Sequence, residues 1–80
     1  MKKTVHSEAY KKSLSELKES RRKNGLTQQD VAKRLGRPQS FVAKYERGER
    51  RLDVLEFIAV ARVLDLDPGT VFGRLVKRVR

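Results

Sequence analysis

The chain has 80 residues and a formal net charge of +10 at pH 7. This length allows one small domain, with too little buried surface for a large enclosed active site. Because the sequence contains no cysteine, it excludes a disulfide framework and a thiolate metal site. It shows neither an apolar run of membrane-spanning length nor a signal peptide. We therefore expect a cytoplasmic protein without a cofactor, a metal or a small-molecule ligand.

The positive charge indicates a polyanionic partner, either nucleic acid or an anionic membrane surface. Ordinary solubility is the alternative explanation, since many small soluble proteins are basic. The charge is unevenly placed: residues 53–80 hold five basic and four acidic side chains, whereas residues 1–52 hold fifteen and six. The more apolar C-terminal third is therefore expected to have a different role from the rest of the chain.

The first predicted element is a long helix that follows a flexible basic arm, residues 1–6. The arm contains His6, which has no second histidine or carboxylate cluster beside it and is not expected to bind a metal. Ser7 can cap the helix, which runs to about Asn24. An apolar stripe with helical spacing supports this helix and consists of Tyr10, Leu14 and Leu17, with Arg21 at the next position.

Three later helices share one starting pattern, a capping residue followed by a helix-compatible first turn. The predicted helices cover residues 27–35, 53–64 and 68–78, and each cap contributes about 1 kcal/mol. The capping residues are Thr27, Asp53 and Asp67; Asp30 and Glu56 complete the first two capping boxes, and Pro68 is the first residue of the third helix.

A further helix is predicted at about residues 38–47, after Gly36 and before Gly48. Pro38 is either its first residue or its cap. No segment alternates with the two-residue period of a strand, so the sequence predicts an all-α fold. Two short helices joined by so tight a turn are typical of a helix-turn-helix, here at about residues 27–47.

The helix at 38–47 has a polar outer face. At 100° per residue, Val42 and Tyr45 point toward the rest of the fold, with Phe41 at the boundary. An amide, a hydroxyl and two cations around a small alanine suit the major groove of DNA. An ordinary solvated face is the alternative. The residues of this face are Gln39, Ser40, Ala43, Lys44 and Arg47.

Two charges lie at inward-facing positions. Glu46 falls beside Val42 rather than on the polar face, and Arg21 continues the apolar stripe of the first helix. The simplest explanation is that they form an ion pair, which would fix how the two helices pack.

The sequence closely resembles the Cro/repressor-type (Xre-like, lambda-repressor-like) helix-turn-helix family over about residues 8–75. The specific features, in their order and spacing, are Gly25-Leu26-Thr27-Gln28, then Gln39-Ser40, then Tyr45-Glu46-Arg47-Gly48. The resemblance implies a compact five-helix domain, residues 7–80, that binds duplex DNA, usually as a homodimer on a pseudo-palindrome.

The resemblance also implies which positions contact DNA. Ala43 stands where many members have serine, which removes a polar contact and favours reading of a thymine methyl group. Gln28 is expected to brace Gln39 as well as to contact a phosphate. The implied base-contacting residues are Gln39, Ser40, Ala43, Lys44 and Arg50, and the implied backbone-contacting residues are Gln28, Arg37, Phe41, Arg47 and Arg51.

The last predicted helix carries apolar residues at helical spacing. Some of them must close the core, and the remainder could form a dimer contact. A purely intramolecular face is equally compatible with the sequence. The residues are Val71, Phe72, Leu75, Val76 and Val79.

We therefore expect a sequence-specific duplex-DNA-binding transcriptional regulator, most simply a homodimeric repressor associated with the nucleoid. The alternative is an antitoxin or co-regulator that serves a protein partner, such as a toxin or RNA polymerase. An enzyme is not expected, because there is one histidine and no phosphate-binding loop or paired carboxylate motif. A membrane-surface helix and an RNA-binding sheet lack the required aromatic residues.

Overall fold

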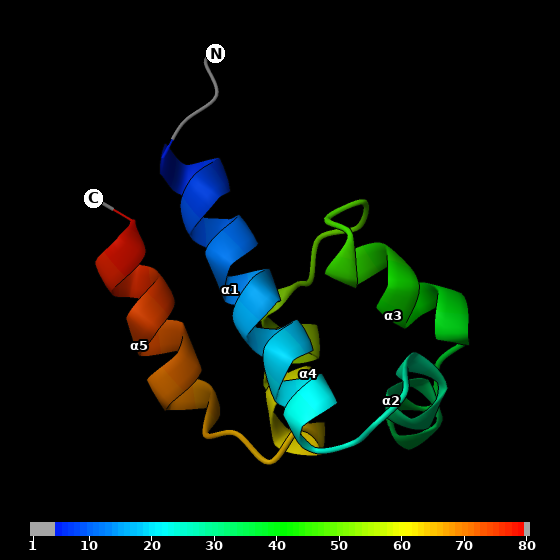
Figure 1. Cartoon of the computed structure of the whole chain (residues 1–80). Helices are drawn as coiled ribbons and strands as arrows, with labels where there is room; N and C mark the ends of the chain where they lie inside the picture. The colour runs from blue at the N-terminus through cyan, green and yellow to red at the C-terminus, as the bar shows by residue number, and fades with distance from the viewer. Residues whose placement is uncertain (1–4, 80) are drawn as a thin grey trace.

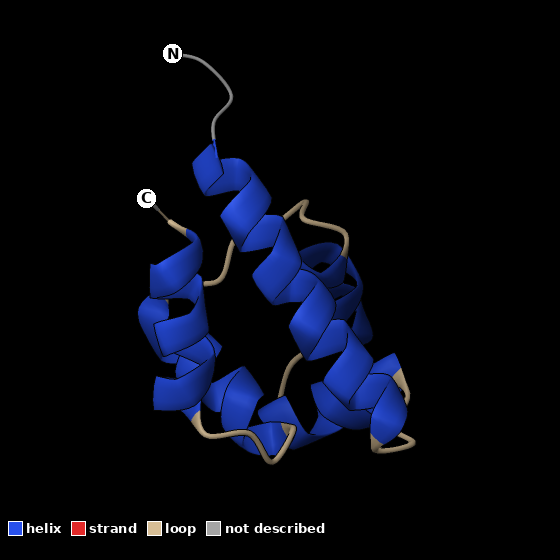
Figure 2. Cartoon of the chain, turned by 60° about the vertical axis from the view of Figure 1, so that its left-hand side comes forward, coloured by secondary structure: helices blue, strands red, loops and turns tan. Residues whose placement is uncertain are grey.

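Helices joined by short turns make up residues 5–79, the part of the chain described by the computed structural model (Figure 1). In these residues there are five helices and no strand (Figure 2), which confirms the all-α prediction. The helices are α1 (Val5–Lys23), α2 (Gln28–Leu35), α3 (Gln39–Glu46), α4 (Val54–Val63) and α5 (Pro68–Arg78).

Three helices begin directly after their predicted caps. The side chain of Thr27 accepts a hydrogen bond from the backbone N–H of Asp30 at 3.0 Å, and the Asp30 carboxylate accepts one from Thr27 N–H at 2.9 Å. Asp53 and Glu56 exchange the same two bonds at the start of α4, at 2.7 and 3.0 Å. At α5, Asp67 accepts from the N–H of the third helical residue at 2.9 Å. Local capping chemistry thus sets these three boundaries.

The start of α1 differs from the expectation. The helix begins at Val5, so Ser7 lies inside its first turn and does not precede it. A serine cap is only one way to satisfy the free N–H groups of a first turn, and water can replace it. Residues 1–4 of the expected arm lie outside the described residues. Pro38 is the cap position of α3 and makes no side-chain capping bond.

The core lies where all five helices meet. Leu17 of α1, Val42 of α3 and Val60 of α4 are completely buried. Helices α1 and α5 pack side by side and run in opposite directions, while α3 and α2 lie on the other side of α1 (Figure 1). The inner face of α3 is consequently fixed by apolar contacts, and its outer face is left to solvent. Within residues 5–79, no helix combines the length and apolarity that crossing a bilayer requires.

Candidate nucleic-acid interface

The turn between α2 and α3 determines which face of α3 is presented. Gly36 adopts φ of 69°, a left-handed conformation that suits glycine. The following N–H, that of Arg37, donates to the Ala32 carbonyl at 2.9 Å and closes the end of α2. The chain can then reverse within three residues. As a result, α3 packs across α2, and Gln39 and Ser40 at its start are exposed.

The polar face predicted for α3 is present. Gln39, Ser40, Lys44 and Arg47 are exposed, and Ala43 between them is half-buried. Val42 and Tyr45 are buried with at most 1% exposed area, as their inward positions predicted. Burial raises the pKa of Tyr45, so its phenol stays neutral and packs as a core residue. An exposed amide, hydroxyl and two cations thus share one continuous helix face.

A buried ion pair joins α3 to α1. Arg21 Nε donates to Glu46 Oε2 at 2.7 Å, and Arg21 Nη2 donates to Glu46 Oε1 at 3.2 Å. The side chain of Glu46 is 2% exposed and that of Arg21 is 12% exposed. Arg21 also donates to the Leu26 carbonyl at 2.8 Å. The expected pair is therefore present, and it fixes the C-terminal end of α3 against α1 and the turn before α2.

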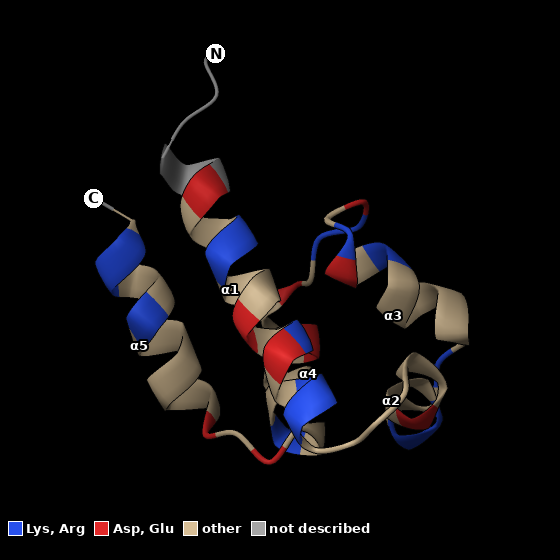
Figure 3. Cartoon of the chain, in the orientation of Figure 1, with Lys and Arg blue, Asp and Glu red and all other residues tan. Residues whose placement is uncertain are grey.

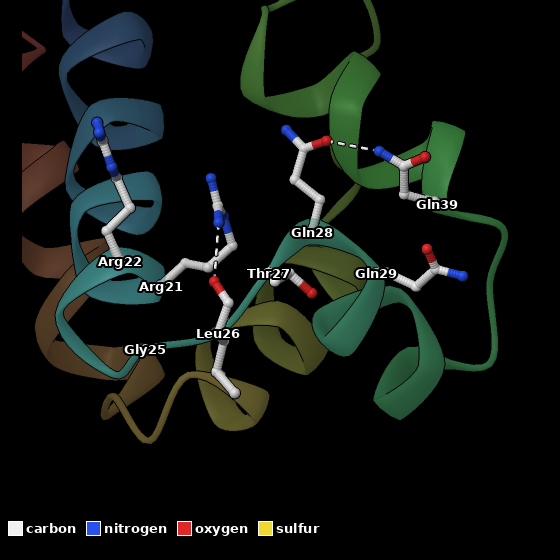
Figure 4. A pocket seen from close by; sticks show the side chains of 8 residues that line it. All are labelled: Arg21, Arg22, Gly25, Leu26, Thr27, Gln28, Gln29 and Gln39. Carbon is white, nitrogen blue, oxygen red and sulfur yellow. Dashed lines mark hydrogen bonds between the residues drawn. The ribbon is translucent and has the colours of Figure 1, made fainter.

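A chain of amides extends from this ion pair to the surface. Gln28 Nε2 donates to Glu46 Oε1 at 2.9 Å, and Gln39 Nε2 donates to Gln28 Oε1 at 2.7 Å. Figure 4 shows the two glutamine side chains meeting between α2 and α3. Each bond fixes the orientation of the next amide, because an amide has distinct donor and acceptor ends. The buried charge of Glu46 thereby determines which end of Gln39 faces solvent.

An open cleft of about 600 Å³ lies beside this amide chain, where α1, α2 and α3 meet (Figure 4). Two of its residues, Arg22 and Gln29, were not singled out in the sequence. Both are exposed. In the sequence, only their positions could have pointed to this cleft. Arg22 follows the buried Arg21, and Gln29 lies in the first turn of α2 after Thr27. The lining residues are Arg21, Arg22, Gly25, Leu26, Thr27, Gln28, Gln29 and Gln39.

A second cluster surrounds Phe41, on the edge of α3 that faces away from the Gln28–Gln39 amide chain. Phe41 is 7% exposed, and the guanidinium carbons of Arg37 and Arg50 lie 4.4 and 4.8 Å from the centre of its ring. Arg37 Nη2 donates to Glu56 Oε2 at 2.9 Å, and Arg50 donates to both oxygens of Glu56 at 2.8 and 3.0 Å. The hydrogen bonds from Arg50 and from the Asp53 N–H, with that from Arg37, lower the pKa of Glu56 to about 2. The carboxylate is therefore ionised in neutral solution.

The two remaining predicted backbone-contact residues, Arg47 and Arg51, lie in different places. Arg47 is exposed and forms an ion pair with Glu49 at 3.2 Å. Arg51 lies over the ring of Tyr10 in α1, at 5.4 Å. Figure 3 shows Lys and Arg gathered at the end of α3 and in the loop after it. Arg47 thus borders the polar face of α3, whereas Arg51 lines an apolar groove with residues of α4 and α5.

The apolar residues of α5 divide into two groups. Val71 is completely buried, and Leu75 is half-buried. In contrast, Phe72, Val76 and Val79 are 48%, 55% and 37% exposed. The helix therefore closes the core with one edge and leaves the other edge uncovered by the described residues.

The helix-turn-helix family model matches residues 17–71 of the chain. The chain belongs to the Cro/Xre-type helix-turn-helix family. A solved structure described as an XRE-family like protein from Pseudomonas syringae pv. tomato str. DC3000 is 43% identical, covers 95% of this chain and 93% of its own, and superposes with a TM-score of 0.87. A search of curated proteins finds no match. The Cro/Xre-type family consists of DNA-binding transcription regulators and is generally non-enzymatic.

Proposed function

We propose that the protein is a sequence-specific regulator that inserts α3 into the major groove of duplex DNA and acts as a homodimeric repressor. The observation that carries this proposal is the amide chain from Glu46 through Gln28 to Gln39. A solvated helix face does not require its first side chain to be oriented from a buried charge. A side chain that reads a base must be oriented, because its donors and acceptors have to match those on the edge of the base.

We assign base reading to the exposed face of α3. Gln39 donates one amide N–H to Gln28. Its carbonyl oxygen and its second amide N–H remain for an adenine edge. Lys44 suits the acceptors of guanine, and Ser40 suits either purine or pyrimidine edges. Ala43 lets the helix approach closely and can touch a thymine methyl group.

We assign backbone contacts to the residues that border this face. Gln28 lies at the start of α2, where the free N–H groups and the helix dipole favour a phosphate. Arg37 and Arg47 can each neutralise a phosphate and release a counterion. Arg51 is exposed over Tyr10 of α1, so its proposed backbone contact lies outside this face. Because Phe41 is only 7% exposed, we assign it a supporting role beneath two arginines in place of a direct contact with the backbone.

Dimerisation is proposed to use the exposed edge of α5. Phe72 and Val76 face outward there, and Phe72 also borders an apolar groove of about 440 Å³ with Val54 and Ile58 of α4. A second copy would cover this surface and place a second α3 at the neighbouring half-site, about one helical turn of DNA away. Occupying a promoter in the cytoplasm would then repress transcription. An antitoxin would offer the same exposed edge to a toxin; light scattering of the purified protein separates the two cases.

Selecting bound sites from a random duplex library tests the proposal directly. We expect a pseudo-palindromic site with two half-sites. Failure to enrich any sequence, with binding that depends on salt alone, would contradict sequence-specific recognition.

Base readers are expected to show position-specific effects. Gln39→Ala and Lys44→Ala should each weaken binding by about 1–3 kcal/mol and relax the preference at one base position. Titrations of the selected duplex and its single-base variants measure both quantities. Equal losses on all the duplexes would show that these side chains do not read bases.

Backbone contacts are expected to show the opposite pattern. Arg47→Ala should weaken binding to every duplex and reduce the slope of log K against log salt by about one, because one phosphate contact is lost. Arg62→Ala makes the same charge change near Asn24 and Asp65 at the end of α4, and should leave the slope nearly unchanged. A base-dependent effect of Arg47→Ala would overturn this assignment.

A further inference from the structure

Glu56 connects two arginines that reach the same place from different parts of the chain. Arg37 precedes α3, Arg50 follows it, and Glu56 lies in the first turn of α4. Both guanidinium groups lie over the Phe41 ring, and both bond to the one carboxylate. The arrangement brings two cations together at the edge of the DNA-facing helix.

The carboxylate is fully committed to this arrangement. It accepts two bonds from Arg50, one from Arg37 and one from the Asp53 N–H. Its side chain is only 12% exposed, whereas both arginine side chains are 41% exposed. Glu56 thus lies beneath the two arginines and is less exposed to solvent than either of them.

The arginines retain donors for a second anion. Among the described residues, Arg37 uses one of its five N–H groups and Arg50 uses three. One carboxylate balances only one of the two positive charges. A phosphodiester has one negative charge and two free oxygens, which matches the remaining charge and donors.

We propose that Arg37 and Arg50 together bind one phosphate of the DNA backbone, and that Glu56 is the positioning residue that holds them for it. This inference rests on the proposed DNA binding. It assigns Arg50 to the backbone and not to the bases, because two bonds to Glu56 and the contact with Phe41 fix its guanidinium beside that of Arg37. The low pKa of Glu56 keeps the arrangement intact in neutral solution.

The proposal predicts an effect of opposite sign to simple electrostatics. Removing a negative charge from a DNA-binding surface should tighten binding. Loss of a positioning residue should weaken it, because two long side chains must then be ordered during binding. Glu56→Gln separates these outcomes, since glutamine can still complete the capping box with Asp53.

We expect Glu56→Gln to weaken binding to the selected duplex by about tenfold, the cost of ordering two arginine side chains. The matched control is Glu49→Gln, which makes the same charge change at an exposed carboxylate paired only with Arg47 among the described residues. It should bind as tightly as the wild type or tighter. Equal or tighter binding by Glu56→Gln would overturn the proposal.

A second comparison separates positioning from a structural role. In an Arg37→Gln/Arg50→Gln background, Glu56→Gln should have no further effect on affinity. A persisting loss of affinity would show that Glu56 acts on folding.

Should Glu56→Gln fail to fold, Phe41→Leu removes the ring beneath the arginines and should weaken binding several-fold. Unchanged affinity of Phe41→Leu would contradict the proposal. If the wild type binds no duplex, the proposed function fails together with this inference, whereas wild-type binding with an inert Glu56 removes the inference alone.

Discussion

Replacing Arg21 with methionine is expected to lower the free energy of unfolding by about 3–5 kcal/mol, the usual cost of removing one partner from a buried ion pair. The loss arises at Glu46, whose side chain is 2% exposed. Without Arg21, the Gln28 amide is the one side-chain donor to this carboxylate that remains among the described residues. Urea unfolding of the wild type and the variant measures the difference. For a small domain this change is a large part of the total stability.

The control for this prediction is an exposed ion pair that also involves arginine. Arg74 donates to Glu16 at 2.8 Å, with side chains 44% and 21% exposed. Arg74→Met should therefore cost less than about 1 kcal/mol. Similar losses in the free energy of unfolding for Arg21→Met and Arg74→Met would show that the buried ion pair stabilises the fold no more than an exposed one.

The double variant Arg21→Met/Glu46→Leu separates stability from recognition. Apolar replacements of both partners should restore most of the stability, because no buried charge is left unpaired. They also remove the acceptor that orients Gln28, and through it Gln39. We expect a folded protein whose discrimination at the base position read by Gln39 is impaired relative to the wild type. A stable double variant that discriminates as well as the wild type at this base position would contradict the role of Glu46 in orienting the amide chain.

The elements that could be predicted from the sequence are those with local physical causes. The caps at Thr27, Asp53 and Asp67 depend on hydrogen bonds within three residues, so each could be located without the fold. The pairing of Arg21 with Glu46 could also be inferred, because each charge is at an inward position of its own helix. Because two opposite charges at inward positions need partners, each could be predicted to pair with the other, although 25 residues separate them.

The features that could not be predicted depend on convergence of distant segments. Glu56 already had a sufficient local explanation as a capping residue, so nothing in the sequence pointed to a second role. Its contacts with Arg37 and Arg50 exist only because α4 packs beside the turn before α3 and the loop after it. Likewise, helical spacing showed that α5 is apolar but did not show that Val71 is covered and Val76 is not.

Exposure on α5 leads to the prediction with the largest effect on DNA binding. Val76→Glu places a charge at the centre of the exposed edge of α5, where the wild-type valine is 55% exposed. Because the side chain is already solvated in the monomer, folding should be little affected. If a second copy covers this edge, the variant should be monomeric by light scattering at micromolar concentration.

The affinity of Val76→Glu for a duplex with two half-sites is expected to fall by about 10²–10⁴-fold, because the second half-site is no longer bound intramolecularly. Its affinity for a single half-site should stay close to that of the wild type. Lys77→Glu is the control: it changes the net charge by more but replaces an exposed cation, so it should remain dimeric. A wild type that is monomeric both with and without the selected duplex would contradict the dimer. A dimeric Val76→Glu variant would instead move the interface elsewhere, since a buried, unpaired carboxylate at the centre of an apolar contact is not compatible with association.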